Sequence, residues 1–276
     1  FDAVAGLQTG SNERFLRYWW EIEISYLING INRENKWANY AKGGPNNKWY
    51  GNSWTVVNWE NNGYDIKVFK DVNGKKRSAV RNEAYYFRNG ITYSFLGGRK
   101  VSFRLLKEYS IFDVSGSSIF KKDQEITLNY LLAFLNSNLC LYLLECLNPT
   151  VNLQVGDLRR IPFLLPSKEF EEKISALTDG NIKIKKQLCS YHIIETNYEK
   201  TPLTIFPEPV LRDRLLSYLN YENTQLTMVL INEAIINQLV FDIYKLSPED
   251  RLQVETQTGK PVGELPVPAK ARDTYL

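Results

Sequence analysis

Histidine is nearly absent from this sequence: the 276 residues include one, His192. Most histidine-based metal sites and catalytic triads need histidine beside further ligands or a nucleophile, so both classes are disfavoured. The three cysteines, Cys140, Cys146 and Cys189, are odd in number and lack the spacing of metal ligands. We interpret them as reduced core cysteines of a cytoplasmic protein.

Long apolar runs are missing too. The most apolar stretch, residues 128–147, is interrupted by three asparagines and a serine, which predicts one buried helix. We therefore expect no membrane partner. No secretory signal opens the chain. Because it begins at Phe1 in what reads as a strand or loop, we expect a fragment of a longer protein.

Motifs for nucleotide chemistry are also absent. The sequence has no phosphate-cradling loop and no glycine-rich dinucleotide fingerprint after a strand. The nearest match to a nuclease core is Asp157 followed by Glu171 and Lys173. The latter two fall in a helical pattern, whereas metal-binding carboxylates of nucleases need rigid strand positions facing one cleft. A metal-dependent nuclease is therefore the least favoured hypothesis, and we predict no metal ligand.

The charge is unevenly distributed, although the net charge is only +3. Residues 33–122 contain 17 Lys or Arg and 7 Asp or Glu, whereas residues 166–276 contain 13 and 16. A basic section of this kind suits a polyanionic partner. A solvated face without any partner explains the same charge equally well.

The patterning changes along the chain. Alternating runs at 54–59, 91–95 and 110–114 predict strands, and glycine- and asparagine-rich turns separate them. After the helix at 128–147 we predict, in order, an extended segment at 148–166, helices at 167–177 and 181–195, a linker at 201–209, a helical unit at 210–245 capped by 247–259, and an extended or disordered tail at 261–276.

These elements predict an α+β fold in three parts. A mixed, β-rich domain at 1–165 is followed by a helical spacer at 166–200 and a helical C-terminal unit with an extended tail at 201–276.

Three segments of the basic section carry residue types that bind nucleic acid. In 42-KGGPNNKWYGN-52, glycines let backbone N–H groups approach a phosphate, lysines neutralise it, and asparagine amides can pair with an adenine edge. The segment 97-GGRKVSFR-104 offers a similar mixture, and 115-SGSSIF-120 offers small hydroxyl side chains. Each alone is also typical of a surface turn, but together they favour nucleic acid.

The run 6-GLQTGSNERFLRYWWEI-22 resembles the start of the target-recognition domain in PglX-type adenine methyltransferases of bacteriophage exclusion (BREX) systems and in related type IIG restriction-modification enzymes. Its pattern Gly-x-x-Thr-Gly-x-Asn-x-x-Phe opens target recognition in many adenine methyltransferases. The similarity continues through residues 40–52, 56–63, 82–96, 111–120, 130–137 and 147–162. Residues 155–174 resemble the exit of specificity-subunit recognition domains, and residues 233–251 resemble the helical ending of the methylase family.

The resemblance implies that this chain recognises double-stranded DNA and that a catalytic domain before Phe1, in the same polypeptide, methylates a flipped adenine at N6. That domain would bind S-adenosylmethionine and carry an Asn-Pro-Pro-Tyr motif. Here Asn148-Pro149 continues as Thr150-Val151, so no catalytic residue or cofactor is assigned to this chain. The alternative is a protein-interaction scaffold that assembles other defence-system proteins.

The candidate DNA contacts combine both arguments. Residues of the opening motif lie, in the family, near the junction with the catalytic domain, and their alternative role is to support the fold there. For Trp49 and Tyr50 the alternative is core packing, and for Asn152 and Gln154 it is satisfying backbone groups beside Pro149. Lys48 and Arg99 are the preferred base readers. The candidates are Gln8, Thr9, Ser11, Asn12, Lys42, Gly43, Gly44, Asn46, Asn47, Lys48, Trp49, Tyr50, Arg99, Lys100, Arg104, Ser115, Ser117, Ser118, Asn152 and Gln154.

Overall fold

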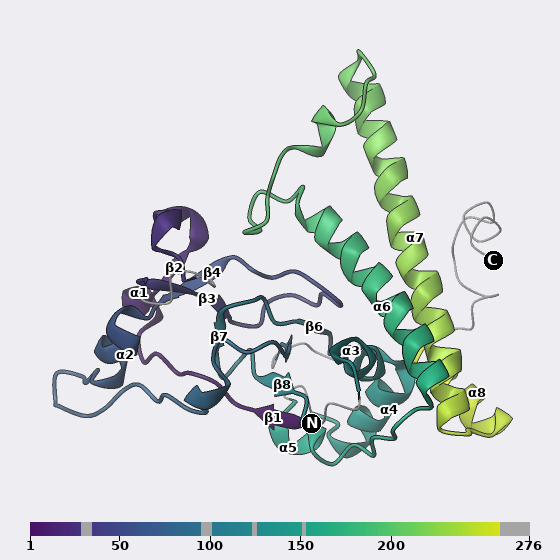
Figure 1. Cartoon of the computed structure of the whole chain (residues 1–276), viewed down its shortest axis with the longest axis horizontal. Coiled ribbons are helices and arrows are strands. Elements are labelled where there is room, and N and C mark those ends of the chain that lie inside the picture. The colour runs from purple at the N-terminus through teal and green to yellow at the C-terminus, as the bar shows by residue number, and fades with distance from the viewer. Residues whose placement is uncertain (29–34, 95–100, 123–125, 151–152, 260–276) are drawn as a thin grey trace. The chain divides into compact units, whose positions relative to one another are not determined.

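The computed structural model (Figure 1) describes residues 1–28, 35–94, 101–122, 126–150 and 153–259. The chain divides into two compact units. Unit 1 comprises residues 1–48, 52–123 and 150–160, and unit 2 comprises residues 49–51, 124–149 and 161–276. Arg99, Lys100 and Asn152 and the tail at 261–276 lie outside the described residues.

Unit 1 contains two four-stranded sheets. The first is antiparallel throughout and has the order β1 (Asp2–Val4), β8 (Ser118–Phe120), β5 (Ile91–Tyr93) and β6 (Phe103–Leu105). The second has the order β2 (Leu16–Tyr18), β4 (Thr55–Asn58), β3 (Trp37–Ala41) and β7 (Ser110–Phe112), with β3 and β7 parallel. The strands predicted at 54–59, 91–95 and 110–114 are confirmed as β4, β5 and β7, each slightly shorter than predicted.

The core of unit 1 is built from apolar side chains of both sheets and the loops between them. Ala38, Val57, Ile111 and Phe112 are fully buried, and Trp59 packs edge-to-face on Tyr86. Such burial is the main favourable term that holds short strands together, since strands of three to five residues make few ladder hydrogen bonds. The aromatic residues that crowd the first third of the sequence therefore serve in large part as core.

Unit 1 also contains short helices. α1 (Asn12–Phe15) and α2 (Glu60–Lys67) lie between strands, as do 3-10 turns at Trp19–Glu21, Ile24–Tyr26 and Glu83–Tyr85, and α5 (Val155–Leu158) follows the last strand in the sequence. The segment 148–166, predicted as extended, thus contains one helical turn. Gln154 and Asp157 form a capping box at its start, with the Gln154 N–H donating to Asp157 Oδ2 at 3.0 Å.

Unit 2 is helical. The helix predicted at 128–147 is two helices, α3 (Leu128–Asn136) and α4 (Asn138–Leu147), which are bent by 62°. Ser137 separates them because its backbone is extended and its hydroxyl caps α4 by accepting from the Cys140 N–H at 3.2 Å. The two helices predicted at 167–177 and 181–195 are one, α6 (Lys168–Cys189), and Ser167 is its N-cap.

The remaining helices of unit 2 are the 3-10 turn Pro202–Thr204, α7 (Leu211–Ile243) and α8 (Pro248–Thr258), which confirms the helices predicted at 210–245 and 247–259. In unit 2, α6 and α7 lie side by side (Figure 1). A buried polar pair joins them, in which Asn232 Nδ2 donates to Asn181 Oδ1 at 2.8 Å.

By length and composition alone, α7 could cross a membrane, and the bent pair α3–α4 would pass the same test together. The sequence predicted no spanning segment because apolar runs are interrupted. Polar side chains interrupt α7 as well, and they make contacts inside unit 2, among them the buried Asn232. Core helices pass the same test of length and composition, and 44% of the apolar window of α7 is buried.

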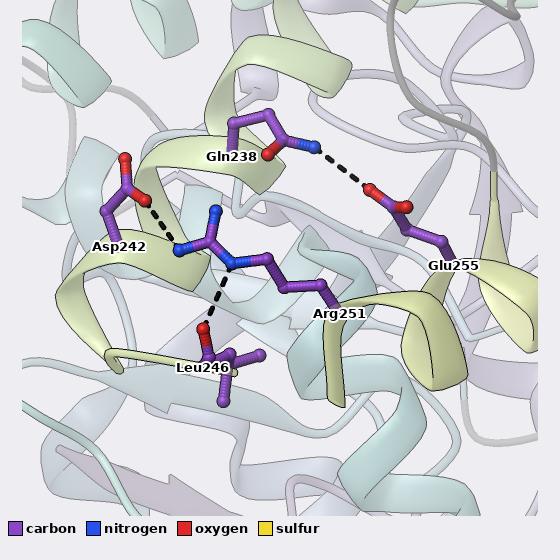
Figure 2. Close-up of polar contacts among 5 residues, drawn as sticks. All are labelled: Gln238, Asp242, Leu246, Arg251 and Glu255. Atoms are coloured by element: carbon purple, nitrogen blue, oxygen red, sulfur yellow. Dashed lines mark hydrogen bonds and ion pairs between the residues drawn. The ribbon is translucent and has the colours of Figure 1, made fainter. Parts of the chain in front are cut away.

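The corner between α7 and α8 is held by polar contacts (Figure 2). Arg251 of α8 donates from Nη2 to Asp242 Oδ1 at 2.7 Å and from Nε to the Leu246 carbonyl at 3.1 Å. Gln238 donates to Glu255 Oε1 at 2.9 Å. These contacts fix the direction in which α8 leaves the end of α7.

The compact units do not follow the predicted boundaries at 165 and 200. Helices α3 and α4, predicted as part of the first domain, belong to unit 2 because α3 packs on α6 and α4 packs on α7 and α8. The prediction of a recognition domain, a spacer and a C-terminal unit concerns what each part does, and it stays a prediction.

Candidate nucleic-acid interface

The opening motif owes its pattern to close packing. A Cβ on Gly6 would lie 1.9 Å from the Phe112 carbonyl oxygen, so only glycine lets this backbone approach β7. Gly10 has a φ of 80°, and a Cβ there would lie 2.7 Å from the Arg77 carbonyl carbon. Both glycines of Gly-x-x-Thr-Gly therefore serve the fold.

The polar residues of this motif make local contacts. Thr9 is buried, and its hydroxyl donates to Asn12 Oδ1 at 2.9 Å. Ser11 is the N-cap of α1 and accepts from the Arg14 N–H. Gln8 and Asn12 are exposed at the surface of unit 1. The structure thus supports the fold-supporting alternative for Thr9 and Ser11, and leaves the side chains of Gln8 and Asn12 accessible.

Residues 42–48, which we call the 42–48 loop, follow β3 directly. Gly43 and Gly44 have φ values of 83° and 108°, in a region that residues with a side chain rarely adopt. Gly44, Pro45 and Asn46 are exposed, and Lys42, Asn47 and Lys48 are half-buried. The loop therefore presents an exposed tip between two lysines.

Buried side chains hold this loop from below. Arg104 donates from Nη2 to the Gly43 carbonyl at 2.7 Å and from Nη1 to Ser94 Oγ at 3.3 Å. Ser94 in turn donates to the Gly44 carbonyl at 2.9 Å. Asn52 Nδ2 donates to the Pro45 carbonyl at 2.9 Å and approaches that of Gly43 at 3.4 Å.

Arg104 is only 1% exposed, so the structure corrects its prediction as a direct DNA contact. It lies on β6 next to Phe103, which is buried as well, so both faces of this strand are covered and the guanidinium reaches the loop backbone. The sequence cannot reveal this, because Arg104 and its carbonyl acceptor are 61 positions apart. Ser94 was missed for the same reason, since its acceptor is 50 positions away. Asn52 is only seven positions from Pro45, but the sequence does not show that its amide turns back to the loop.

The 115–120 segment closes the other side of the loop. Ser115 is half-buried, and its hydroxyl contacts the Lys42 carbonyl at 3.0 Å and Asp113 Oδ1 at 2.6 Å. Ser117 and Ser118 are buried, and their hydroxyls donate to the Val114 and Gly116 carbonyls. The prediction of direct DNA contact is therefore corrected for these last two serines, which satisfy backbone groups instead.

Asp113 is the acidic group next to Lys42. Its carboxylate accepts from the Tyr40 hydroxyl at 2.6 Å and from the Ser115 N–H at 2.7 Å. Burial lowers the pKa of Lys42 from its ordinary value, and the negative charge of Asp113 opposes this shift. The pKa of Tyr40 is raised by burial and by the same carboxylate, so this tyrosine stays a hydrogen-bond donor.

The aromatic pair after the loop differs in burial. Trp49 is 1% exposed and belongs to unit 2, where its Nε1 donates to Glu233 Oε1 at 2.6 Å. Core packing is thus the correct alternative for Trp49, and its predicted DNA contact is corrected. Tyr50 is half-buried. Gln154 is exposed and is the N-cap of α5, where it forms the capping box with Asp157.

The acidic residues of the nuclease hypothesis have structural contacts. Asp157 caps α5 in unit 1, and Glu171 Oε1 in unit 2 accepts from the Thr127 N–H at 2.5 Å, at the start of α3. Across the described ranges, no group of three or more His, Cys, Asp or Glu side chains is placed to hold a metal ion.

Among solved structures, the chain resembles one region of a restriction-modification enzyme in fold. It matches the type IIL restriction-modification enzyme MmeI, solved in complex with DNA, with a TM-score of 0.52 and 9% identity. The match covers 93% of this chain and 34% of that one, and at this identity it concerns the fold alone.

Sequence similarity points to adenine methyltransferases in particular. The chain is 31% identical over 265 residues to the adenine-specific methyltransferase PglX of Lacticaseibacillus casei (strain Zhang), covering 90% of this chain and 22% of that protein. It is 28% identical over 280 residues to the adenine-specific methyltransferase BrxX of Escherichia coli O9:H4 (strain HS), covering 99% and 22%. No protein-family model matches. The chain is therefore similar to one region of PglX-type methyltransferases and spans about a fifth of the length of these relatives.

Proposed function

We propose that this chain is the part of a bacterial adenine-specific DNA methyltransferase that recognises duplex DNA, in a restriction-modification or phage-defence setting. Its similarity to one region of PglX and BrxX supports the class of protein. The single observation that carries the recognition role is the 42–48 loop, because an exposed tip flanked by Lys42 and Lys48 is held rigidly by buried donors. Rigid, cationic loops of this kind suit a DNA backbone and its base edges.

In this proposal the accessible candidates contact DNA and the buried ones hold the loop in place. Lys42 and Lys48 neutralise phosphates or read guanine, and the amides of Asn46 and Asn47 reach base edges. Gln8, Asn12, Tyr50, Ser115 and Gln154 lie at or near the surface of their own unit and stay candidates. Arg99, Lys100 and Asn152 stay predictions as well.

The cofactor of such an enzyme would be S-adenosylmethionine, and the described residues do not fit it. Nucleotide-like cofactors bind where parallel strands end beside crossover helices. Among the named strands of unit 1, β3 and β7 alone pair in parallel, and β7 is flanked by short loops instead of a helix. We therefore propose that another domain of the full-length protein binds the cofactor and transfers the methyl group, and that this domain is the main partner of the chain. We propose a cytoplasmic location for the full-length protein.

Selection of bound duplexes from a random pool tests the proposal. The full-length protein should enrich a consensus that contains adenine. Lys48→Gln should weaken binding to that duplex about tenfold and relax the preference at one base position. Lys70→Gln is the matched control, since this exposed lysine of unit 1 lies outside the candidate set. Equal binding of all duplexes by the native protein would contradict sequence recognition.

A protein-interaction scaffold is the second candidate, and one observation favours it. The N-terminal half of α7 exposes Leu215, Leu216 and Leu219 to between 41% and 47%. Exposed leucines on one helix suit a partner protein. Removing residues 201–276 would expose the core that α6 shares with α7, so substitutions are the better test. Leu215→Gln with Leu219→Gln should abolish partner binding and leave DNA binding unchanged.

A further inference from the structure

Three basic side chains outside the candidate set gather around the first strand of unit 1, and we call Arg88, Lys122 and Arg159 the β1 cluster. Lys122, two residues after β8, forms an ion pair with Asp2 of β1, with Nζ 3.0 Å from Oδ1. Arg159, directly after α5, donates from Nη2 to the Ala3 carbonyl at 2.7 Å. These contacts bring the two side chains together because β8 pairs with β1 and α5 packs on β1 (Figure 1).

Arg88 joins the cluster through aromatic side chains. Its guanidinium lies 5.1 Å from the ring centre of Tyr85 and 5.9 Å from that of Phe120. The Tyr85 hydroxyl donates to Asp2 Oδ2 at 2.9 Å, so one carboxylate connects the environments of Arg88 and Lys122. A guanidinium placed over aromatic rings leaves the N–H groups at its edge to pair with an anion.

Positive charge exceeds negative charge in the β1 cluster. Within the described parts of the chain, the ion pair with Asp2 is the only one that the three cations make, so two positive charges are uncompensated. The hydrogen bond to Asp2 raises the pKa of Lys122, and the nearby positive charge of Arg159 opposes this rise. Arg88 and Arg159 are exposed, and the Lys122 side chain is 60% exposed. Cations that gather on an exposed surface attract an anionic ligand.

We propose that the β1 cluster binds a phosphate of the DNA backbone, separate from the phosphates that the 42–48 loop contacts. This inference rests on the proposed function and adds a second place of contact with the duplex. Guanidinium groups pair with a phosphate through two parallel N–H bonds, and an ammonium group adds a point charge. Holding β1 in place requires less charge, because Lys122 and Arg159 already contact this strand without Arg88.

One duplex can reach both places. The Ser115 hydroxyl contacts the 42–48 loop, and Lys122 follows Ser115 by seven residues. Seven residues span at most about 25 Å, which is less than the roughly 34 Å of one turn of duplex DNA. The phosphate bound by the β1 cluster therefore lies within about one turn of those at the loop.

The test determines which side chains each DNA phosphate depends on. A duplex that the full-length protein binds is prepared as a series in which a neutral methylphosphonate replaces one phosphate at a time. We expect one position at which this replacement weakens binding of the native protein about tenfold and has no effect on Arg88→Gln with Arg159→Gln. Lys42→Gln with Lys48→Gln should keep this sensitivity, and so should the control Arg77→Gln, since Arg77 is an exposed arginine of unit 1 outside the cluster. Because the replaced group belongs to the DNA, the loss also distinguishes a backbone phosphate from a free phosphate ion.

Arg159→Gln also removes the hydrogen bond to Ala3 and can loosen β1, so Arg88→Gln alone is the second variant. Arg88 contacts Tyr85 and Phe120 through their rings, and its loss leaves the contacts of β1 in place. This variant should reduce the loss at the sensitive position to about threefold and leave the other positions unchanged. If Arg88→Gln and the double variant both keep the native sensitivity at every position, the phosphate site is refuted while DNA recognition stands. If the native protein binds no duplex, the proposed function itself fails, and this inference with it.

Discussion

Replacing Arg104 with methionine should destabilise unit 1 by about 2–3 kcal/mol. The guanidinium is buried and donates to the Gly43 carbonyl at 2.7 Å and to Ser94 Oγ at 3.3 Å. A hydrogen bond from a charged donor contributes about 1.5–3 kcal/mol, and the longer bond to a neutral hydroxyl contributes less. Methionine fills much of the same volume, so the loss of these bonds dominates over a cavity.

Tryptophan fluorescence during urea unfolding is the suitable assay. All six tryptophans precede residue 60, and five of them, Trp49 excepted, belong to unit 1. Arg81→Met is the control, because Arg81 is an exposed arginine of the same unit. The control should change the free energy of unfolding by less than about 0.5 kcal/mol. If Arg104→Met changed it as little as the control does, Arg104 would not be holding the loop.

Three further outcomes are expected in unit 2. Asn232→Leu alone should lower the free energy of unfolding by about 1–3 kcal/mol, measured by helical circular dichroism in urea, because Asn181 loses its partner. Asn181→Leu with Asn232→Leu should restore much of this loss, and additive losses would contradict the pairing. Lys245→Gly should raise the free energy of unfolding in the same assay by about 0.5–1 kcal/mol, because Lys245 has a φ of 51° after α7, a conformation that favours glycine. A lower free energy of unfolding would contradict this. Iodoacetamide at pH 8 should label the exposed Cys146 in the native protein and spare the other two thiols, because burial raises the pKa of Cys140 and raises that of Cys189 to about 12. Mass spectrometry identifies the labelled residue, and labelling of Cys140 first would contradict this expectation.

The sequence predicted the α+β class correctly, because periodicity and capping are local properties. The 42–48 loop was recognisable for the same reason, since its glycines and lysines are neighbours in the chain. Ser137 shows the limit of such reasoning: a serine within an apolar run reads equally as a tolerated polar residue or as a helix cap, and only packing decides.

The environment of each mispredicted residue is determined by tertiary contacts. A basic residue in a basic segment reads as a surface charge, yet Arg104 is buried on a strand whose two faces are both covered. Trp49 likewise lies next to exposed loop residues and is nevertheless buried against Glu233, 184 positions away. Neither contact leaves a local signal, because pairing over such separations is set by the whole fold.

The proposed function requires that the basic loops of unit 1 bind the backbone of a DNA duplex. Its most direct test is the equilibrium affinity of the full-length protein for one duplex between about 50 and 200 mM salt. We expect the logarithm of the affinity to fall linearly with the logarithm of the salt concentration. Lys42→Gln with Lys48→Gln should make this slope shallower by the equivalent of about two phosphate contacts. An affinity that is independent of salt, or a slope that the double substitution leaves unchanged, would contradict it.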